Sequence, residues 1–265
     1  MSTGAPLLVE QRGQVRWLRL NRPDRRNALD AELISALDKQ ITAAEADPET
    51  AVVAVSGNGP SFCAGGDFRQ FLKLDEQGRN PVEFLTDVST CFSRIEASPV
   101  PWVAALHGHV VAGGLELALV CDVVVAADST LIGDGHLNHR LTPAGGSSVR
   151  LAGAVGRGLA RRLLLTGELL PARDFAHTGW IQSIVPEADL DATAMRLAHL
   201  LAGRHSPAQR ELKTLLHRIE GLTPDVALRA ELATFADNWT RSSVVDALTA
   251  FLDTRPAEAT KAETA

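Results

Sequence analysis

Two glycine-rich segments have the residue types and positions that carbonyl chemistry requires. Glycine pairs stand in residues 62–67 (FCAGGD) and in residues 112–118 (AGGLELA), and each pair lies between an expected strand and an expected helix. The first N–H groups of a helix have no partner inside the helix, so two such turns could direct their N–H groups at one oxygen. The alternative is that the glycines only allow two tight turns.

Glu116 is the most informative single residue. It stands one turn into a helix that we expect to be buried, in the apolar segment GGLELALV. Because burial disfavours the charged form, we expect the pKa of this carboxyl to be raised into a range that suits general acid–base catalysis. The alternatives are a core glutamate held by an ion pair and one held by hydrogen bonds.

An ordered set of segments resembles the enoyl-CoA hydratase/isomerase (crotonase) family. Each segment alone is a weak signal, but the set covers nearly the whole chain in the family's order. The segments are NRPDRRNAL at 21–29, SFCAGGDF at 61–68, GHVVAGGLELALVCD at 108–122, PAGG at 143–146, LLLTGELLPARDFAHTGWIQSIVP at 163–186 and a weaker AFLDTRPA at 250–257.

This resemblance implies a fold and an assembly. The fold would be α/β, a crotonase-like spiral of ββα units with a helical C-terminal region. We therefore expect a spiral core with the acyl-CoA site at residues 1–190 and a helical trimerisation region at 191–265. The assembly would be a homotrimer or a dimer of trimers.

The resemblance also implies a substrate and the residues that hold it. The substrate would be an acyl-CoA thioester, with coenzyme A as part of the substrate and no separate cofactor. The backbone N–H groups of Gly66 and Gly113 would stabilise the enolate oxygen, and the carbonyl of Ala64 would accept from the adenine. The arginines would meet the phosphates, although plain surface charge is their alternative. The full set expected to contact coenzyme A or the substrate is Arg25, Arg26, Ala28, Ala64, Asp67 and Arg69.

His136 is the main departure from the family pattern. Hydratases of the family use two glutamates; Glu116 matches the first, and the second is expected seven residues before Pro143, where this chain has His136. A histidine can also hold water and exchange a proton, with an ordinary pKa near ~6.5. Alternatively, His136 only binds a polar group of a bulkier acyl tail. Asp134 is placed either to orient His136 or to shape the turn.

These residues favour an enoyl-CoA hydratase-like lyase. Glu116 would be the general acid or base, and His136 would bind water or substrate. One alternative is another crotonase-fold reaction with the same two residues: C–C bond hydrolysis, decarboxylation or isomerisation. A second alternative is a protein that binds coenzyme A with little catalysis.

Composition excludes several other classes of protein. Of the 265 residues, 45% are hydrophobic and 22% charged, which is typical of a globular protein. The net charge of 26 − 32 = −6 argues against a nucleic-acid partner. We expect a cytoplasmic protein without a secretory signal, a membrane span or a metal site, since residues 110–125 include Glu116 and Asp122 and the three cysteines lack ligand spacing.

The elements that must position these residues follow from periodicity. Alternation over 7–21 with Gly13 in the middle predicts a hairpin, and apolar runs predict short strands. We expect Asn27 to cap a helix and Ser147 and Ser148 to cap another. Strands are expected at 51–56, 102–106, 123–127 and 180–185, helices at 84–96, 157–165, 172–178, 189–203, 207–220, 224–240 and 242–252, and a frayed tail from Pro256.

Overall fold

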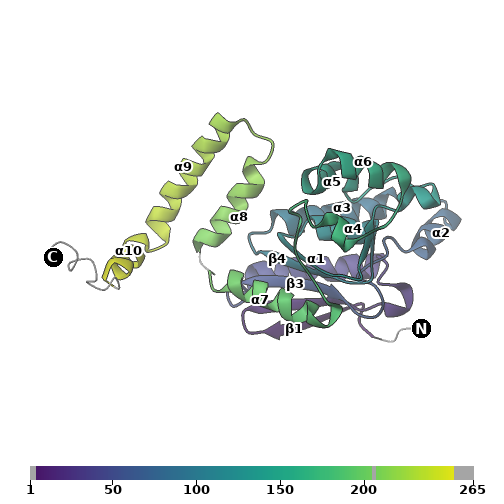
Figure 1. Cartoon of the computed structure of the whole chain (residues 1–265), viewed down its shortest axis with the longest axis horizontal. Helices are drawn as coiled ribbons and strands as arrows, with labels where there is room; N and C mark the ends of the chain where they lie inside the picture. The colour runs from purple at the N-terminus through teal and green to yellow at the C-terminus, as the bar shows by residue number, and fades with distance from the viewer. Residues whose placement is uncertain (1–3, 205–206, 254–265) are drawn as a thin grey trace, which may run out of the picture. The chain divides into compact units, whose positions relative to one another are not determined.

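The chain forms two compact units. The computed structural model describes residues 4–204 and 207–253 (Figure 1). The first unit ends at Arg204 and the second begins at His205. The tail predicted from Pro256 lies outside the described residues.

A mostly parallel sheet forms the centre of the first unit. Within residues 4–204 it has six strands in the order β1-β2-β3-β4-β6-β9. The first two strands form the predicted antiparallel hairpin around Gly13, whose φ is 59°, and every other neighbouring pair is parallel. The strands are β1 (Leu7–Arg12), β2 (Val15–Leu20), β3 (Val52–Gly57), β4 (Trp102–Leu106), β6 (Val123–Ala127) and β9 (Ile181–Val185).

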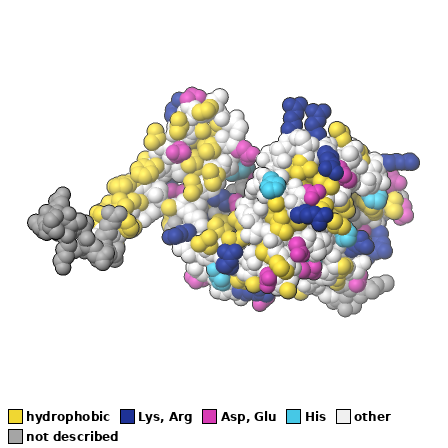
Figure 2. All heavy atoms as spheres, in the orientation of Figure 1, with side chains coloured by type: hydrophobic (Ala, Val, Ile, Leu, Met, Phe, Trp, Pro, Cys, Tyr) yellow, Lys and Arg dark blue, Asp and Glu magenta, His cyan; other side chains and the backbone are white. Residues whose placement is uncertain are grey.

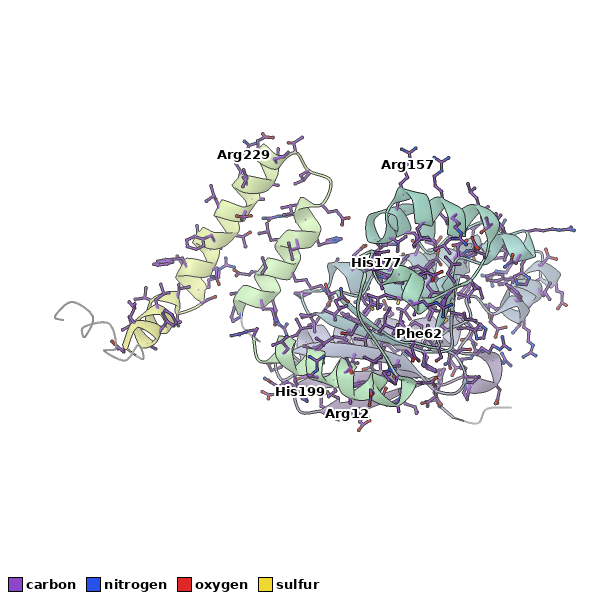
Figure 3. All side chains as sticks on the ribbon, viewed as in Figure 1. Arg12, Phe62, Arg157, His177, His199 and Arg229 are labelled. Carbon is purple, nitrogen blue, oxygen red and sulfur yellow. The ribbon has the colours of Figure 1, made fainter. Side chains whose placement is uncertain are left out.

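Both faces of this sheet are covered, which explains its continuous apolar strands. Val53 and Val55 of β3 face one core and Val52 and Ala54 face the other, as the two-residue repeat of a strand requires. Figure 3 shows Phe62 inside the first unit, where it is fully buried in the first of these cores.

Helix α7 (Leu190–Ala202) covers the second face of the sheet (Figure 1). It buries Leu190, Ala194, Ala198 and Ala202 in that core, one residue every four, so small side chains let the helix approach the strands. The helical C-terminal unit therefore begins after Arg204, and α7 belongs to the sheet unit rather than to the expected helical region from residue 191.

The other helices of the first unit confirm most of the predicted ones. The predicted helix at 172–178 is instead a 3₁₀ turn, η3 (Ala172–Phe175). The helices are α1 (Ala31–Ala46), α2 (Phe68–Glu76), α3 (Val82–Ala97), α4 (Gly113–Leu119), α5 (Ser147–Val155) and α6 (Arg157–Thr166).

The predicted helix caps were wrong. The cap of α1 is Asp30, whose side chain accepts from the N–H of Leu33 at 3.0 Å. Asn27 is buried with a φ of 55°, and its amide donates to the carbonyls of Asn58 and Ser61. Helix α5 follows Gly146 and has no side-chain cap. The propensity of a residue for a cap was outweighed in each case by tertiary hydrogen bonding or by a backbone conformation that glycine adopts most easily.

A second, smaller sheet lies at the site described below. It contains β5 (His109–Val111), β7 (Leu131–Gly133) and β8 (Leu170–Pro171), in the order β5-β7-β8. Strands β5 and β7 are parallel, so the glycine-rich turn after β5 and the turn after β7 leave the sheet at the same edge.

The second unit is helical, as predicted. Its helices are α8 (Pro207–Ile219), α9 (Pro224–Arg241) and α10 (Val244–Asp253). Across the described residues of both units, no helix has the length and apolar composition needed to cross a membrane.

Candidate active site

One cavity of about 580 Å³ is lined by every residue that the sequence analysis assigned to catalysis or to binding of the substrate. Its wall includes both glycine-rich turns, part of α2 and α3, and the segment after β7. The sequence-predicted residues that line it are Glu116, His136, Gly66, Gly113, Arg25, Arg26, Ala28, Ala64, Asp67 and Arg69. Their placement is therefore established, whereas their chemical roles remain predictions.

The two glycine-rich turns lie against each other because strand-like hydrogen bonds join them. The N–H of Cys63 donates to the carbonyl of His109 at 3.2 Å, and the N–H of Val111 donates to the carbonyl of Cys63 at 3.0 Å. Gly65 has a φ of 100°, and a Cβ there would lie 2.9 Å from the Cβ of Ala112. This contact explains why glycine is needed at position 65.

The N–H groups of Gly66 and Gly113 are available to a ligand. Both residues line the cavity, and neither N–H has an acceptor among the described residues. Ala112, directly before Gly113, has φ 51° and ψ −118°, a conformation that is strained for a residue with a Cβ. The strained residue thus sets the direction of the peptide group that carries the Gly113 N–H.

Glu116 is both buried and held in place. Its exposed fraction is 2%, and its Oε1 accepts from the N–H groups of Gly145 at 2.9 Å and Ser147 at 3.1 Å. A Cβ at position 145 would clash with Oε2, so any larger residue there would displace the carboxylate. Oε2 has no hydrogen-bond donor among the described residues. One oxygen fixes the side chain while the other stays available, which suits a group that exchanges a proton.

His136 begins the 3₁₀ turn η2 (His136–His139), which follows β7. Its Nδ1 lies 3.0 Å from Oδ1 of Asp134, a fully buried carboxylate. Burial alone would lower the pKa of His136. The hydrogen bond and charge of Asp134, together with the charge of Glu116, outweigh burial and raise the pKa above its ordinary value. His136 therefore retains its proton to higher pH than a free histidine.

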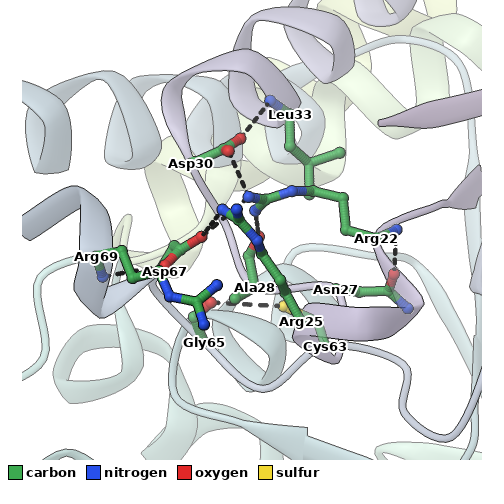
Figure 4. Close-up of polar contacts among 10 residues, drawn as sticks. All are labelled: Arg22, Arg25, Asn27, Ala28, Asp30, Leu33, Cys63, Gly65, Asp67 and Arg69. Atoms are coloured by element: carbon green, nitrogen blue, oxygen red, sulfur yellow. Dashed lines mark hydrogen bonds and ion pairs between the residues drawn. The ribbon is translucent and has the colours of Figure 1, made fainter. Parts of the chain in front are cut away.

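Arg22 organises the loop that carries Gly66, although the sequence reasoning did not single it out (Figure 4). Its buried guanidinium lies 2.6 Å from Oδ2 of Asp30 and 2.9 Å from Oδ2 of Asp67, and it donates to the carbonyl of Ala28. Asp67 also pairs with Arg25 at 3.0 Å and caps α2 by accepting from the N–H of Arg69. Asp67 thus ties the first glycine turn to the segment before α1.

The charge state of Asp67 reflects these contacts. Burial would raise the pKa of this carboxyl. Hydrogen bonds from Arg22 and Arg25 and from the backbone N–H of Arg69, together with the charge of Arg22, outweigh burial and lower the pKa. Arg25 is therefore already paired with a carboxylate, although its side chain is 44% exposed.

Aromatic rings form an apolar wall of the cavity. Phe71 lies 6.2 Å from Phe68 and 6.0 Å from Phe84 between ring centroids, and Phe68 packs edge-on against His139 at 4.7 Å. All four rings line the cavity. His109 also lines it, whereas His107 bonds to the carbonyl of Gly59 at 2.9 Å.

The protein-family model for enoyl-CoA hydratase/isomerase matches residues 10–261 of this chain. The chain belongs to the enoyl-CoA hydratase/isomerase family. This identification confirms the resemblance, and the protein is an enzyme of that family with the predicted crotonase-like α/β fold.

Two curated relatives and one solved structure illustrate the likeness. The 2,3-dehydroadipyl-CoA hydratase of Escherichia coli is 33% identical over 86% of this chain and 86% of its own. The short-chain-enoyl-CoA hydratase of Clostridium acetobutylicum is 29% identical over 96% and 97%. The crystal structure of an enoyl-CoA hydratase from Polaromonas sp. JS666 matches with a TM-score of 0.87 at 31% identity, covering 94% of this chain and 97% of its own.

Proposed function

We propose that this family member is a hydratase-type lyase that adds water to a 2-enoyl-CoA thioester. The observation that carries the proposal is the shared cavity of two acid–base side chains, Glu116 and His136, and two unpaired N–H groups, those of Gly66 and Gly113. Addition of water to such a thioester needs both features, because charge develops on oxygen while protons move at carbon.

The N–H groups would act on the thioester oxygen. As hydroxide adds to Cβ, electrons move through the double bond to this oxygen and form an enolate. Donors from Gly66 and Gly113 that are already in position stabilise the enolate more than the neutral carbonyl, and this difference lowers the barrier. Backbone hydrogen bonds join the turn that contains Cys63 to the strand that contains Val111, and they hold both N–H groups in place.

The two side chains would divide the proton transfers. Glu116 takes a proton from water while the water oxygen bonds to Cβ. His136 in its protonated form then gives a proton to Cα, which collapses the enolate to the 3-hydroxyacyl thioester. The proton on Glu116 returns to His136 through solvent, and the enzyme is restored. The raised pKa of His136 supports its role as the acid.

Coenzyme A would enter as part of the substrate, and the proposal involves no separate cofactor. Arg25, Arg26 and Arg69 line the cavity with Ala28, and their charges suit the phosphates. The carbonyl of Ala64 is proposed to accept from the adenine.

Hydrolysis of a C–C bond next to a ketone is the second candidate. A histidine beside two unpaired N–H groups could activate water for attack on a ketone held there, and His136 in this cavity favours that reading over isomerisation or decarboxylation. The products separate the two candidates, because hydrolysis yields two fragments and hydration yields one 3-hydroxyacyl thioester. A protein that binds coenzyme A without turnover would give neither.

The test uses crotonyl-CoA and a longer 2-enoyl-CoA in ¹⁸O-labelled water, with products followed by mass spectrometry. We expect one labelled oxygen in a 3-hydroxyacyl-CoA, and loss of this product in Glu116→Gln. Glu83→Gln is the matched control, because Glu83 is exposed on α3. Native rates in Glu116→Gln, or no labelled product from either thioester, would refute the proposal.

The proposed homotrimer, or dimer of trimers, has support from the second unit. None of the side chains described on α9 and α10 is buried. Figure 2 shows apolar side chains over the visible face of these helices. Exposed apolar side chains of this extent mark a protein contact in soluble proteins. Light scattering on the purified protein tests the assembly, and cell fractionation tests the cytoplasmic location, which remains a prediction. The exposed large apolar side chains of these helices are Val226, Leu228, Leu232, Phe235, Trp239, Val245, Leu248, Phe251 and Leu252.

A further inference from the structure

Asp134 is a buried carboxylate that the mechanism above does not use. It follows the last residue of β7, and its side chain is 0% exposed. Oδ1 lies 3.0 Å from Nδ1 of His136, and Oδ2 is buried with no hydrogen-bond donor among the described residues. Among the described residues, no lysine or arginine forms an ion pair with Asp134, so His136 is its partner.

A buried carboxylate destabilises the folded protein unless a charged or hydrogen-bonding partner lies beside it. Burial of a carboxylate with one oxygen unsatisfied is strongly unfavourable. A residue with a purely structural role at this turn would be less costly as an asparagine or serine. The burial of Asp134 against His136 therefore points to a role that needs a negative charge beside Nδ1.

We infer that Asp134 is a positioning residue that accepts the Nδ1 proton of His136 and so leaves Nε2 directed at the cavity. Asp134 and His136 then act as a dyad in place of a second glutamate. The role in turnover rests on the proposed function. The tautomer and titration of His136 are properties of the folded protein, whatever reaction it catalyses.

The backbone around the dyad leaves the imidazole little freedom. Gly135 has a φ of 66°, and a Cβ there would lie 2.6 Å from Cγ1 of Val111, so the turn is pressed against β5. At the other side, the amide of Asn138 donates to the carbonyl of Gly167 at 2.8 Å. Because Gly135 and Asn138 are both held in place and Nδ1 is bonded to Asp134, the ring presents Nε2 in one orientation.

The charged groups around His136 support the same assignment. Asp134 lies at the end of β7 and Glu116 comes from α4, and both favour the protonated ring. His109 of β5 and His139 of η2 line the same cavity. Helix α6 also packs against η2 and carries Arg157, Arg161 and Arg162, which are exposed; Figure 3 shows Arg157 pointing into solvent. The two carboxylates are therefore the groups that raise the pKa of His136 against the opposing effect of burial.

The first test measures His136 itself by ¹⁵N NMR of histidine-labelled protein without substrate. The signal is assigned by its absence in His136→Gln. In the native protein we expect Nδ1 to carry the proton of the neutral ring. In Asp134→Asn we expect the pKa of His136 to fall and the tautomer preference to weaken. Asp128→Asn is the control, because Asp128 is exposed at the end of β6 and should leave the titration unchanged.

The second test is a double-mutant cycle on turnover. Asp134→Asn should lower kcat on the order of 10- to 100-fold with little change in KM. It should also move the descending limb of the pH profile toward acid, because the protonated ring is the active form. In the His136→Gln background the same substitution should have no further effect, because Asp134 acts through His136.

The outcomes separate this inference from the proposed function. If Asp134→Asn shifts the titration of His136 but no thioester is hydrated, the dyad stands and the proposed reaction fails. If the titration and tautomer are unchanged in a folded Asp134→Asn protein, the dyad is refuted. An equal loss of kcat from Asp134→Asn with and without His136 also refutes it. Circular dichroism of each variant shows whether it is folded.

Discussion

Arg22 is the buried charge whose removal should cost the most stability at this site. The guanidinium is 10% exposed and lies between the carboxylates of Asp30 and Asp67, at 2.6 and 2.9 Å. Arg22→Met keeps a long apolar stem but removes the charge and its donors. The expected result is a less stable protein, because the loop before α1 and the first glycine turn lose the ion pairs that Arg22 makes between them.

The size of the loss in unfolding free energy depends on the partners that each carboxylate retains after Arg22 is replaced. Removing one partner of a buried ion pair costs about 3–5 kcal/mol, because the other charge remains buried. Asp67 keeps Arg25 at 3.0 Å, and Asp30 keeps the N–H of Leu33. Since neither carboxylate is left without a partner, the lower end of the range applies, and we expect a loss of about 3 kcal/mol in the free energy of unfolding.

Urea unfolding at pH 7, followed by circular dichroism, measures this loss. Arg79→Met is the matched control, since Arg79 pairs with Glu83 on the surface, where the side chains are 54% and 77% exposed. An exposed pair of this kind contributes about 0.3–0.5 kcal/mol. If Arg22→Met costs no more than Arg79→Met, the reasoning about the buried network is wrong.

The pH dependence of the loss provides an independent check. The pKa of Asp67 is lowered in the folded protein, so its ion pairs contribute fully above its unfolded pKa of about 3.9. That contribution is lost as the pH falls toward the folded pKa. The difference between native protein and Arg22→Met should therefore shrink below about pH 4, and a constant difference would refute the assignment.

Four further substitutions test the backbone strain, the close contacts of glycines and the titration of His136. Ala112→Gly should raise the melting temperature, because it relieves a positive φ worth about 1 kcal/mol, and a lower value would refute the strain. Gly114→Ala should prevent stable folding, since its Cβ would lie 2.2 Å from the carbonyl oxygen of Cys63, whereas Gly153→Ala meets nothing within 4 Å and should stabilise α5 by roughly 0.5–1 kcal/mol. The stability that His136 contributes is complete below its unfolded pKa of about 6.5 and is lost as the pH rises through its raised folded pKa. Urea midpoints between pH 6 and 8 should thus fall less in His136→Gln than in the native protein, and parallel curves would contradict this.

The sequence by itself determined the elements and the chemical candidates. The hairpin at Gly13 and the strands β3, β4 and β6 follow from local periodicity, which a short stretch of chain contains in full. Glu116 could be predicted as buried because its neighbours are apolar, and His136 was found by counting from Pro143. Motif order identified the family because several weak local signals agreed.

The tertiary structure decided what the candidates can do. Asn27 and Asp30 are both good capping residues, and the choice between them depended on carbonyls of Asn58 and Ser61, more than 30 residues away. Arg22 gave no signal of its own, because its importance comes from carboxylates that the fold brings to it. Local patterns record which residues are apolar or turn-forming. Only the packing of distant segments sets which N–H groups stay unpaired and which charges face each other.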